Sequence, residues 1–348
     1  MEPIISSLSL FKFRGIQNLS LPDLAQINVL VGANNCGKTS VLEAIKLLAQ
    51  PENIGALMQV ALLRAPSKKR VEKAVEYFST IFTKEMDHTD TAHYSLNLEI
   101  TANGQLYGYE AGGDIGILTD TTGRASKTFS LTTKVIESNK KPLYLTHRIQ
   151  NGIHESFEVS QEPLYRSVYL HSGVSFYTSC VKFLSDSIIN EQKHEILNII
   201  QSFDPNVEDI SIVGEDIYLH NKISGTLPLF SYGSGLQKAV LLTALLANNR
   251  GAVVLIDEID NAINISAFQE VFSWFVDACM RLNVQTFVTT HSAETLDAIL
   301  ESADDREQDS IRIITLRKDT EQQKTTAVIR TGKTALLERS QFEMELRV

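Results

Sequence analysis

The sequence has little cysteine, no long apolar run and a deficit of positive charge. Its three cysteines, Cys36, Cys180 and Cys279, are widely spaced and fit neither a disulfide framework nor a zinc ribbon, so a reducing, cytoplasmic environment is predicted. The longest apolar run, over 239–247 and interrupted by Thr243, is far too short to cross a membrane. The first residues also lack the basic start of a secretion signal. Secretion, membrane insertion and a membrane partner are therefore not expected.

Acidic residues outnumber basic ones. The 348 residues include 42 Asp and Glu against 32 Lys and Arg, a net charge of −10, so the molecule as a whole repels nucleic acid. DNA contact would need a local basic patch, for which Lys68-Lys69-Arg70 and Lys140-Lys141 are candidates, although a solvated charged surface explains both more simply. With 43% hydrophobic residues and only 8 prolines, the chain is an ordinary globular protein.

Apolar periodicity predicts an α/β chain whose outer segments differ from its middle. Alternating apolar residues predict a strand over 5–13, and an apolar run over 26–31 leads through a glycine-rich turn to a helix from Lys38. Asn103-Gly104 and Asn151-Gly152 are typical hairpin turns, so the middle of the chain favours antiparallel strands. The other expected elements are a helix over 71–82, a polar stretch over 83–93, an irregular segment over 112–126, helical periodicity over 183–200, short strands near 210 and 217, and buried strands over 252–256 and 284–290.

The strongest signal is a phosphate-binding loop, Gly32-Ala33-Asn34-Asn35-Cys36-Gly37-Lys38-Thr39, which follows an apolar strand and opens a helix. Its glycines let successive backbone amides face one anion, the Lys38 ammonium would reach the outer phosphates, and the Thr39 hydroxyl would ligate Mg²⁺. Ser40 completes the expected nucleotide-binding segment. A similar Gly332-Lys333-Thr334 lacks the first glycine of the pattern, because Ala327 stands there, and is interpreted as a turn.

Two buried strands end in polar residues suited to hydrolysis. The run over 252–256 ends in Asp257-Glu258, and carboxylates at such a strand end face the nucleotide crevice. Asp257 is predicted to hold Mg²⁺, and Glu258 to polarise the water that attacks the γ-phosphate. His291 follows the strand over 284–290 and is predicted to hydrogen-bond to the γ-phosphate or to that water. An acidic helix start and a structural histidine are the simpler interpretations, and the phosphate loop disfavours both.

A second cluster of potential ligands, Met86-Asp87-His88-Thr89-Asp90 with His93, has the composition of a metal site. No predicted strand or helix fixes these side chains in place. We therefore interpret the cluster as a solvated acidic loop, with no metal bound.

The order of the main motifs resembles an ABC-type ATPase head, and within that class the OLD-like, RecF and SMC relatives among the AAA-family ATP-binding proteins. The motifs that carry the resemblance are Phe11-Lys12-Phe13-Arg14-Gly15, the phosphate loop with Glu43-Ala44-Ile45, Ser231 to Lys238, Asp257-Glu258, Thr289-Thr290-His291-Ser292 and the short tail Glu343 to Arg347.

The resemblance implies an α/β P-loop NTPase fold, organised as a single head over 1–348. Residues 1–50 would supply N-terminal strands and the phosphate loop, residues 51–165 an inserted helix and antiparallel β-rich lobe, and residues 166–348 a helical signature lobe, the strand-end residues and the tail. Phe11 or Phe13 would either stack on adenine or fill the core, with the core favoured for Phe13.

The resemblance also implies binding of ATP and Mg²⁺ and hydrolysis of ATP. In such proteins the signature serine of one head completes the nucleotide site of a second, so ATP would join a homodimer or a higher oligomer. Ser234 with Gly235 is the candidate signature, Ser231 is the alternative, and a serine-rich helix cap is the simpler interpretation. Arg14 would either neutralise nucleotide charge or form a surface ion pair.

Two departures from the family pattern shape the functional hypothesis. Ala262-Ile263-Asn264 stands where the relatives carry a Gly-Leu-His turn, which argues for slow turnover. The segment over 292–348 is too short for the TOPRIM nuclease domain of OLD-like nucleases, so a separate effector, such as a nuclease, is expected. The leading hypothesis is a regulatory ATPase in DNA maintenance or antiviral defence. The second hypothesis is an ATP-binding scaffold with little or no turnover. The third is a transporter motor, but no feature of the sequence indicates one.

Overall fold

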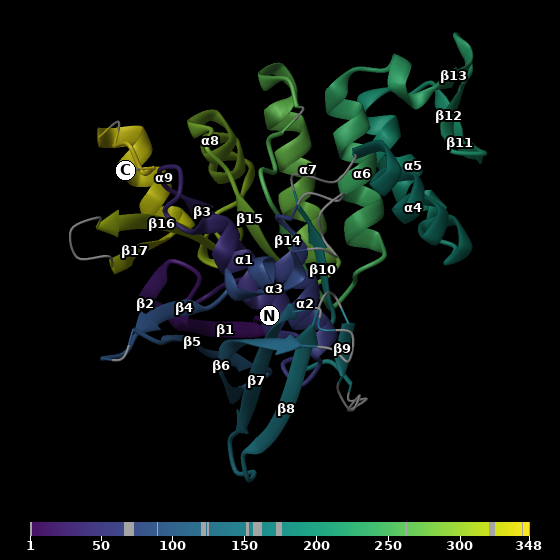
Figure 1. Ribbon diagram of the computed structural model, residues 1–348. Coiled ribbons are helices and arrows are strands. Elements are labelled where there is room, and N and C mark those ends of the chain that lie inside the picture. The colour runs from purple at the N-terminus through teal and green to yellow at the C-terminus, as the bar shows by residue number, and fades with distance from the viewer. Residues whose placement is uncertain are drawn as a thin grey trace.

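The computed structural model contains two large sheets with helices around them (Figure 1). It describes residues 2–65, 73–88, 90–119, 123, 125–150, 153–155, 162–171, 176–261, 263–319, 324–342 and 344–347. The basic cluster at 68–70, the predicted turn at Asn151-Gly152, and Ala262 lie outside the described residues.

A six-stranded sheet carries the phosphate loop. Its order is β10 (Ser167–Leu170), β14 (Val253–Ile256), β15 (Gln285–Thr289), β3 (Ile27–Val31), β16 (Ile311–Asp319) and β17 (Lys324–Thr331). All neighbouring strands are parallel except β16 and β17. Every residue of β3, β14 and β15 is buried, because both faces of the sheet are covered. This double burial is why these strands appear in the sequence as uninterrupted apolar runs.

The helices divide between the two faces of this sheet. Helix α1 (Lys38–Leu48) packs on one face with the alternate residues Leu30, Leu255 and Phe287. On the other face lie α6 (Ser234–Ala247), α7 (Phe268–Arg281) and α8 (Ala293–Ser302). These helices form a second core with part of α4 (Phe176–Ile189), with α5 (Lys193–Phe203) and with a small sheet. The strands of the small sheet are β11 (Val207–Val213), β12 (Asp216–Asn221) and β13 (Gly225–Pro228). Short 3-10 turns, η2 (Leu229–Ser231), η3 (Ile265–Ala267) and η4 (Glu307–Ser310), precede α6, α7 and β16.

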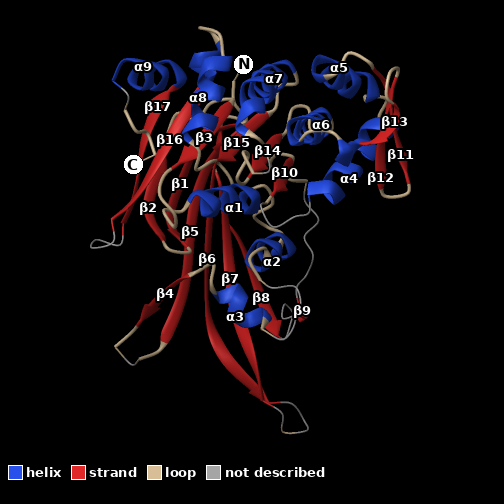
Figure 2. Ribbon diagram, turned by 90° about the horizontal axis from the view of Figure 1, so that it is seen from above, coloured by secondary structure: helices blue, strands red, loops and turns tan. Residues whose placement is uncertain are grey.

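An eight-stranded antiparallel sheet lies beneath α1, α2 (Ile54–Leu62) and α3 (Ala74–Ser79), as Figure 2 shows from above. Its strands run in the order β2, β1, β5, β6, β7, β8 and β9, and β4 also pairs with β5. The bounds are β1 (Ile5–Phe13), β2 (Ile16–Leu21), β4 (Thr83–Met86), β5 (Ala92–Ala102), β6 (Gln105–Thr119), β7 (Ala125–Glu137), β8 (Leu143–Gln150) and β9 (Ile153–Glu155). Apolar residues on one face of this sheet complete the first core.

The predicted strands over 5–13, 26–31 and 252–256 and the helix from Lys38 are confirmed. The antiparallel strands from 51–165 do not form a sheet of their own, because β1 pairs directly with β5. The boundary expected at residue 50 therefore does not separate two sheets.

The irregular segment expected over 112–126 is wrong, because β6 continues to Thr119 and β7 begins at Ala125. The glycines of this segment favoured an irregular chain in the sequence analysis, but in the structure they allow two paired strands to approach closely. A Cβ atom on Gly113 would lie 2.1 Å from the Ser130 carbonyl oxygen and 2.7 Å from the Phe129 ring. Only glycine fits this approach.

Three further local predictions need correction. Helix α3 ends at Ser79, and β4 lies within the stretch expected to be an irregular loop. The helical periodicity over 183–200 belongs to two helices, α4 and α5. Gly332, interpreted as a turn, begins α9 (Gly332–Phe342), and a Cβ atom there would lie 2.4 Å from Oε1 of Gln308.

None of the helices in the described residues is long and apolar enough to cross a membrane.

The two large sheets are joined by the buried amide of Gln285. Its Nε2 donates to the carbonyl oxygens of Ile5 (2.7 Å) and Ala25 (2.9 Å), and its Oε1 accepts from the Ile5 amide (2.7 Å). We expect Gln285→Met, which keeps the volume, to lower the free energy of unfolding by roughly 3 kcal/mol because it leaves buried backbone groups unpaired. Chemical denaturation measures the change. The exposed Gln269→Met is the control, and an equal loss in both variants would contradict this role.

Candidate nucleotide site

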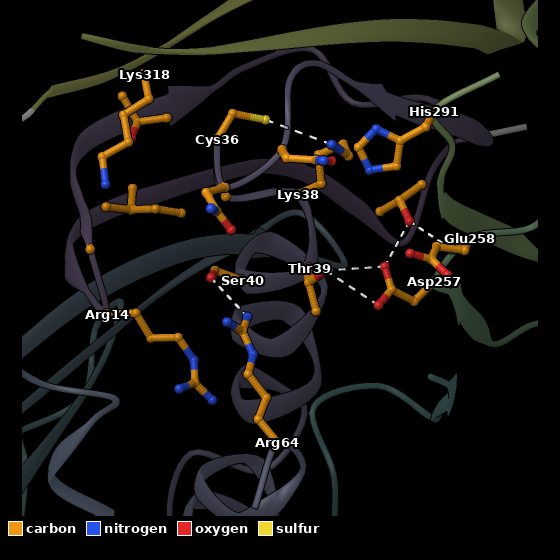
Figure 3. Close-up of a pocket in the computed structure, with 17 residues that line it drawn as sticks. Arg14, Cys36, Lys38, Thr39, Ser40, Arg64, Asp257, Glu258, His291 and Lys318 are labelled. Atoms are coloured by element: carbon orange, nitrogen blue, oxygen red, sulfur yellow. Dashed lines mark hydrogen bonds between the residues drawn. The ribbon is translucent and has the colours of Figure 1, made fainter. Parts of the chain in front are cut away.

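A cavity of about 470 Å³ lies where β3, β14 and β15 end (Figure 3). The carboxyl ends of neighbouring parallel strands meet at one edge of a sheet, so this edge collects segments that are far apart in the sequence. The lining consists of Arg14, Gly15, Ile16, residues 34–40, Arg64, Asp257, Glu258, Thr289, His291, Lys318 and Thr325. The residues expected to bind phosphate and metal and to catalyse hydrolysis are thus brought together.

The phosphate loop curls because of its two outer glycines. Gly32 has φ 140° and Gly37 has φ 108°, both in the region that favours glycine. Space is also lacking for any larger residue, since a Cβ atom would lie 2.4 Å from the Leu316 carbonyl oxygen at Gly32 and 2.8 Å from Ile16 at Gly37. Ala33, Asn34 and Asn35 are exposed, and Asn35 also lies in the left-handed region, whereas Cys36 is buried.

Lys38 is the first residue of α1 and folds back over the loop. Its Nζ donates to the carbonyl oxygens of Gly32 (2.8 Å) and Ala33 (3.0 Å). Burial lowers the pKa of Lys38, and the neighbouring Cys36 and Asp257 partly oppose this effect. The ammonium group is thus held at the cavity by neutral carbonyls, which a phosphate anion can replace at little cost.

Asp257 joins the phosphate loop to two strands. The Thr39 hydroxyl lies 3.2 Å from each carboxylate oxygen of Asp257, and the Thr289 hydroxyl donates to one of them at 2.7 Å. These contacts fix the carboxylate at the end of β14, between the loop after β3 and the end of β15 (Figure 3). Carboxylate and hydroxyl oxygens are the ligands that Mg²⁺ prefers in proteins, so the pair Thr39 and Asp257 fits that ion.

Glu258 lies in a strained backbone conformation. Its φ is 54°, which costs a non-glycine residue about 1–3 kcal/mol. The Thr289 hydroxyl accepts a 2.8 Å hydrogen bond from the Glu258 amide and so helps to hold this conformation. Thr289 therefore orients both acidic residues, a role that the sequence analysis did not assign to it.

His291 lines the cavity on the same side as Lys38 and Glu258 (Figure 3). Burial, followed by the nearby positive charge of Lys38, lowers the pKa of His291 from its ordinary value of 6.5. The ring is therefore neutral at pH 7 and can both donate and accept a hydrogen bond.

Arg14 takes part in a charged cluster with the buried Glu43 and the exposed Arg64. The Arg14 Nε lies 2.7 Å from Oε2 of the fully buried Glu43, and Arg64 contacts both Glu43 oxygens at 2.9 and 2.8 Å. Of the two alternatives for Arg14, the ion pair is thus present, but it is buried and not on the surface. Arg64 also donates to the Ser40 hydroxyl at 3.1 Å. Two guanidinium groups share one carboxylate, which leaves positive charge beside the cavity.

The structure separates the signature residues from this cavity. Ser234 begins α6, Gly235 is packed against Ala267, and neither lines the cavity. Ser231 is exposed and donates to the Pro228 carbonyl oxygen at 2.6 Å.

Other sequence-based expectations concern residues outside the cavity. Phe13 is fully buried in the first core, as favoured, and Phe11 is half-buried. The expectation that no strand fixes the side chains of the acidic stretch at 86–93 is wrong at its two ends, because Met86 ends β4 and His93 lies in β5, where it contacts Asp114 (2.8 Å) and Asp87 (3.1 Å). Among the described residues no group of three or more metal-ligating side chains is present, there or elsewhere.

Arg64 and Lys318, which do line the cavity, belong to no motif, and no sequence signal would have found them.

Comparison with known proteins decides the family. Residues 4–179, slightly more than half of the chain, match the family model described as "AAA ATPase domain". The chain belongs to this family. Residues 128–297 also match a model described as "AAA domain, putative AbiEii toxin, Type IV TA system". This AAA ATPase domain therefore binds and hydrolyses ATP, as the phosphate loop predicts.

The full-length matches agree with this assignment. The chain is 21% identical over 335 residues to an "ATP/GTP phosphatase" of Helicobacter pylori, covering 85% of this chain and 87% of that protein. It is also similar to an SMC head bound to the C-winged helix domain of ScpA, with TM-score 0.51, 13% identity and coverage of 96% and 99%. An SMC head from Pyrococcus furiosus, with an extended coiled coil and bound to the C-terminal domain of ScpA, gives TM-score 0.51, 12% identity and coverage of 99% and 100%. The predicted α/β P-loop fold of ABC-ATPase type is confirmed.

The hydroxyl of Thr289 supplies a direct test of the site. We expect Thr289→Val to lower kcat for ATP hydrolysis roughly tenfold or more, because losing two oriented hydrogen bonds removes at least about 1.4 kcal/mol of preorganisation. Thr289→Ser, which keeps the hydroxyl, should retain a rate within about threefold of wild type. Steady-state phosphate release measures both. Equal rates in the Val and Ser variants would show that the hydroxyl does not orient the acidic pair.

Proposed function

We propose that this ATPase is the regulatory switch of a DNA-maintenance or antiviral defence complex of the OLD-like kind. In this proposal two heads close on ATP, open after hydrolysis and signal to a separate effector protein, for which a nuclease is the leading candidate. The observation that carries it is the cavity itself, which gathers residues 34–40 of the phosphate loop with Asp257, Glu258 and His291 but leaves the signature outside.

The cavity residues have distinct roles in this proposal. Lys38 and the amides of residues 33–39 hold the phosphates, and Thr39 and Asp257 hold Mg²⁺, which neutralises phosphate charge when bound. Glu258 accepts the proton of the attacking water. The neutral ring of His291 hydrogen-bonds to the γ-phosphate or to that water. Arg14 and Arg64 add positive charge at the edge of the site.

Closure of two heads is supported by the surface beside the signature. Phe230, next to Ser231, is 63% exposed, and Ile265, in the turn that packs on α6 through Ala267, is 64% exposed. Large apolar side chains at such positions are suited to burial against a partner. A second copy of the chain would cover them and would bring Ser234 and Gly235 to the phosphates of the opposite head.

A signal to a separate effector protein is supported by the comparisons with known proteins. The structurally similar SMC heads are each bound to a ScpA domain, and one matching family description refers to a type IV toxin–antitoxin system. Direct DNA contact has less support, since Lys140 is neutralised by Glu137 at 2.8 Å. The buried, unpaired thiols of Cys36, Cys180 and Cys279 suit the proposed cytoplasmic location.

A second candidate function is an ATP-binding scaffold with little turnover. Asn264 stands where the relatives carry a histidine, and its Oδ1 accepts from the Ser266 amide at 3.1 Å. The side chain therefore caps η3, a purely structural role.

Turnover distinguishes the two candidates. We expect Glu258→Gln to lower phosphate release at least about a hundredfold, since it removes the general base, while ATP affinity measured by calorimetry stays within about threefold. Lys38→Ala should abolish measurable ATP binding, because it removes the ammonium group that the phosphate loop holds against the phosphates. A negligible wild-type rate that Glu258→Gln does not change would favour the scaffold.

The oligomeric state tests head closure. With ATP and Mg²⁺, we expect Glu258→Gln to trap a dimer that light scattering detects after size exclusion. Adding Ser234→Arg should return the protein to the monomer without loss of ATP binding, because the bulky cation would occupy the interface. Ser231→Arg is the matched control. If only Ser231→Arg disrupts the dimer, Ser231 is the signature residue, and a monomer in every case contradicts closure.

A further inference from the structure

Residues 344–347, which we call the tail clamp, are fixed on the edge of the second core. The Met344 amide donates to the Glu338 carbonyl at 3.2 Å, and Arg339 donates to the Met344 carbonyl at 3.1 Å. Leu346 is only 1% exposed, and its carbonyl oxygen accepts from the Thr315 hydroxyl of β16 at 2.7 Å. The tail clamp is therefore anchored at Met344 and at Leu346 before Arg347 is reached.

Arg347 is held in one orientation by Glu345. Its Nε and Nη2 donate to the two Glu345 carboxylate oxygens at 2.8 and 2.6 Å, the two-point geometry that fixes the plane of a guanidinium group. The hydrogen bond from Arg347 lowers the pKa of Glu345 to about 2, so this pair stays charged at any pH at which the protein would be assayed.

The third nitrogen of Arg347 is directed at the chain beside the nucleotide cavity. Its Nη1 donates to the His291 carbonyl oxygen at 2.8 Å. His291 lies between the end of β15, where the Thr290 amide donates to Leu30 at 3.3 Å, and the start of α8, where Ser292 caps the helix. Arg347 thus donates a charged hydrogen bond to the backbone at the junction between β15 and α8. At this junction the chain has left the hydrogen bonds of the sheet and has not yet entered those of the helix.

We propose that Arg347 is a positioning residue for His291, and that the tail clamp holds the imidazole in register with the γ-phosphate. The inference rests on the proposed role of His291 in hydrolysis. Arg347 does not line the cavity, but its hydrogen bond fixes the backbone of the residue that carries the imidazole ring. Displacement of the tail clamp by a bound effector would then slow hydrolysis without disturbing the phosphate loop.

A double-mutant cycle tests this role. We expect Arg347→Met to lower kcat for ATP hydrolysis roughly tenfold, with the Kd for ATP changed by less than about twofold. Arg347→Lys, which keeps a charged donor, should recover part of the rate. In a His291→Ala background, Arg347→Met should lower the remaining rate less than about twofold, because the group through which it acts is gone. Arg281→Met, at the far end of α7, controls for loss of an exposed arginine.

The outcomes are distinguishable. Additive losses in the double variant, or a loss of ATP affinity equal to the loss of kcat, would overturn the positioning role and leave the proposed function intact. No hydrolysis by the wild type would instead overturn the proposed function. If Arg347→Met proves too unstable to assay, Glu345→Gln weakens the same fork while Arg347 remains, and the same cycle with His291→Ala decides the question.

Discussion

The carboxylate of Asp257 is the contact on which the nucleotide site depends. It accepts hydrogen bonds from Thr39, at the start of α1, and from Thr289, at the end of β15, while its own backbone closes β14. Three chain segments, one of them more than two hundred residues from the other two, therefore meet at one side chain. Because Thr289 also holds the strained amide of Glu258, the same hydroxyl orients both acidic residues, the one proposed to bind the metal and the one proposed to activate water.

This meeting point requires a sheet that is rigid and buried on both faces. Strands β3, β14 and β15 are fully buried, and the amide of Gln285 ties them to the start of β1 in the antiparallel sheet. The strain at Glu258 and the partly buried ammonium of Lys38 both carry a cost in stability. Two extensive cores offset that cost, so the ligand-binding edge can be held in a geometry that an isolated loop would not keep.

The site was largely predictable because its signals are local. Gly32 and Gly37 mark the curl of the loop, and buried runs ending in Asp257 or His291 place those residues at one sheet edge. The cluster of Arg14, Glu43 and Arg64 was not predictable, since it exists only through the packing of α2 on α1. The second half of β6 was missed for a related reason, because Gly113 looks like a chain breaker until its approach to Ser130 of β7 is known. The choice between Ser231 and Ser234 as the signature residue was not predictable either, because it rests on the proposed closure of two heads.

The course of β1 gives the antiparallel sheet a mechanical connection to the ligand. The strand belongs to that sheet along its length, and the residue immediately after it, Arg14, is part of the cavity wall. The long hairpin of β6 and β7 extends far from this point (Figure 2). Because β1 is hydrogen-bonded to β5, β5 to β6 and β6 to β7, a shift of Arg14 on nucleotide binding would be passed from strand to strand toward the described ends of this hairpin.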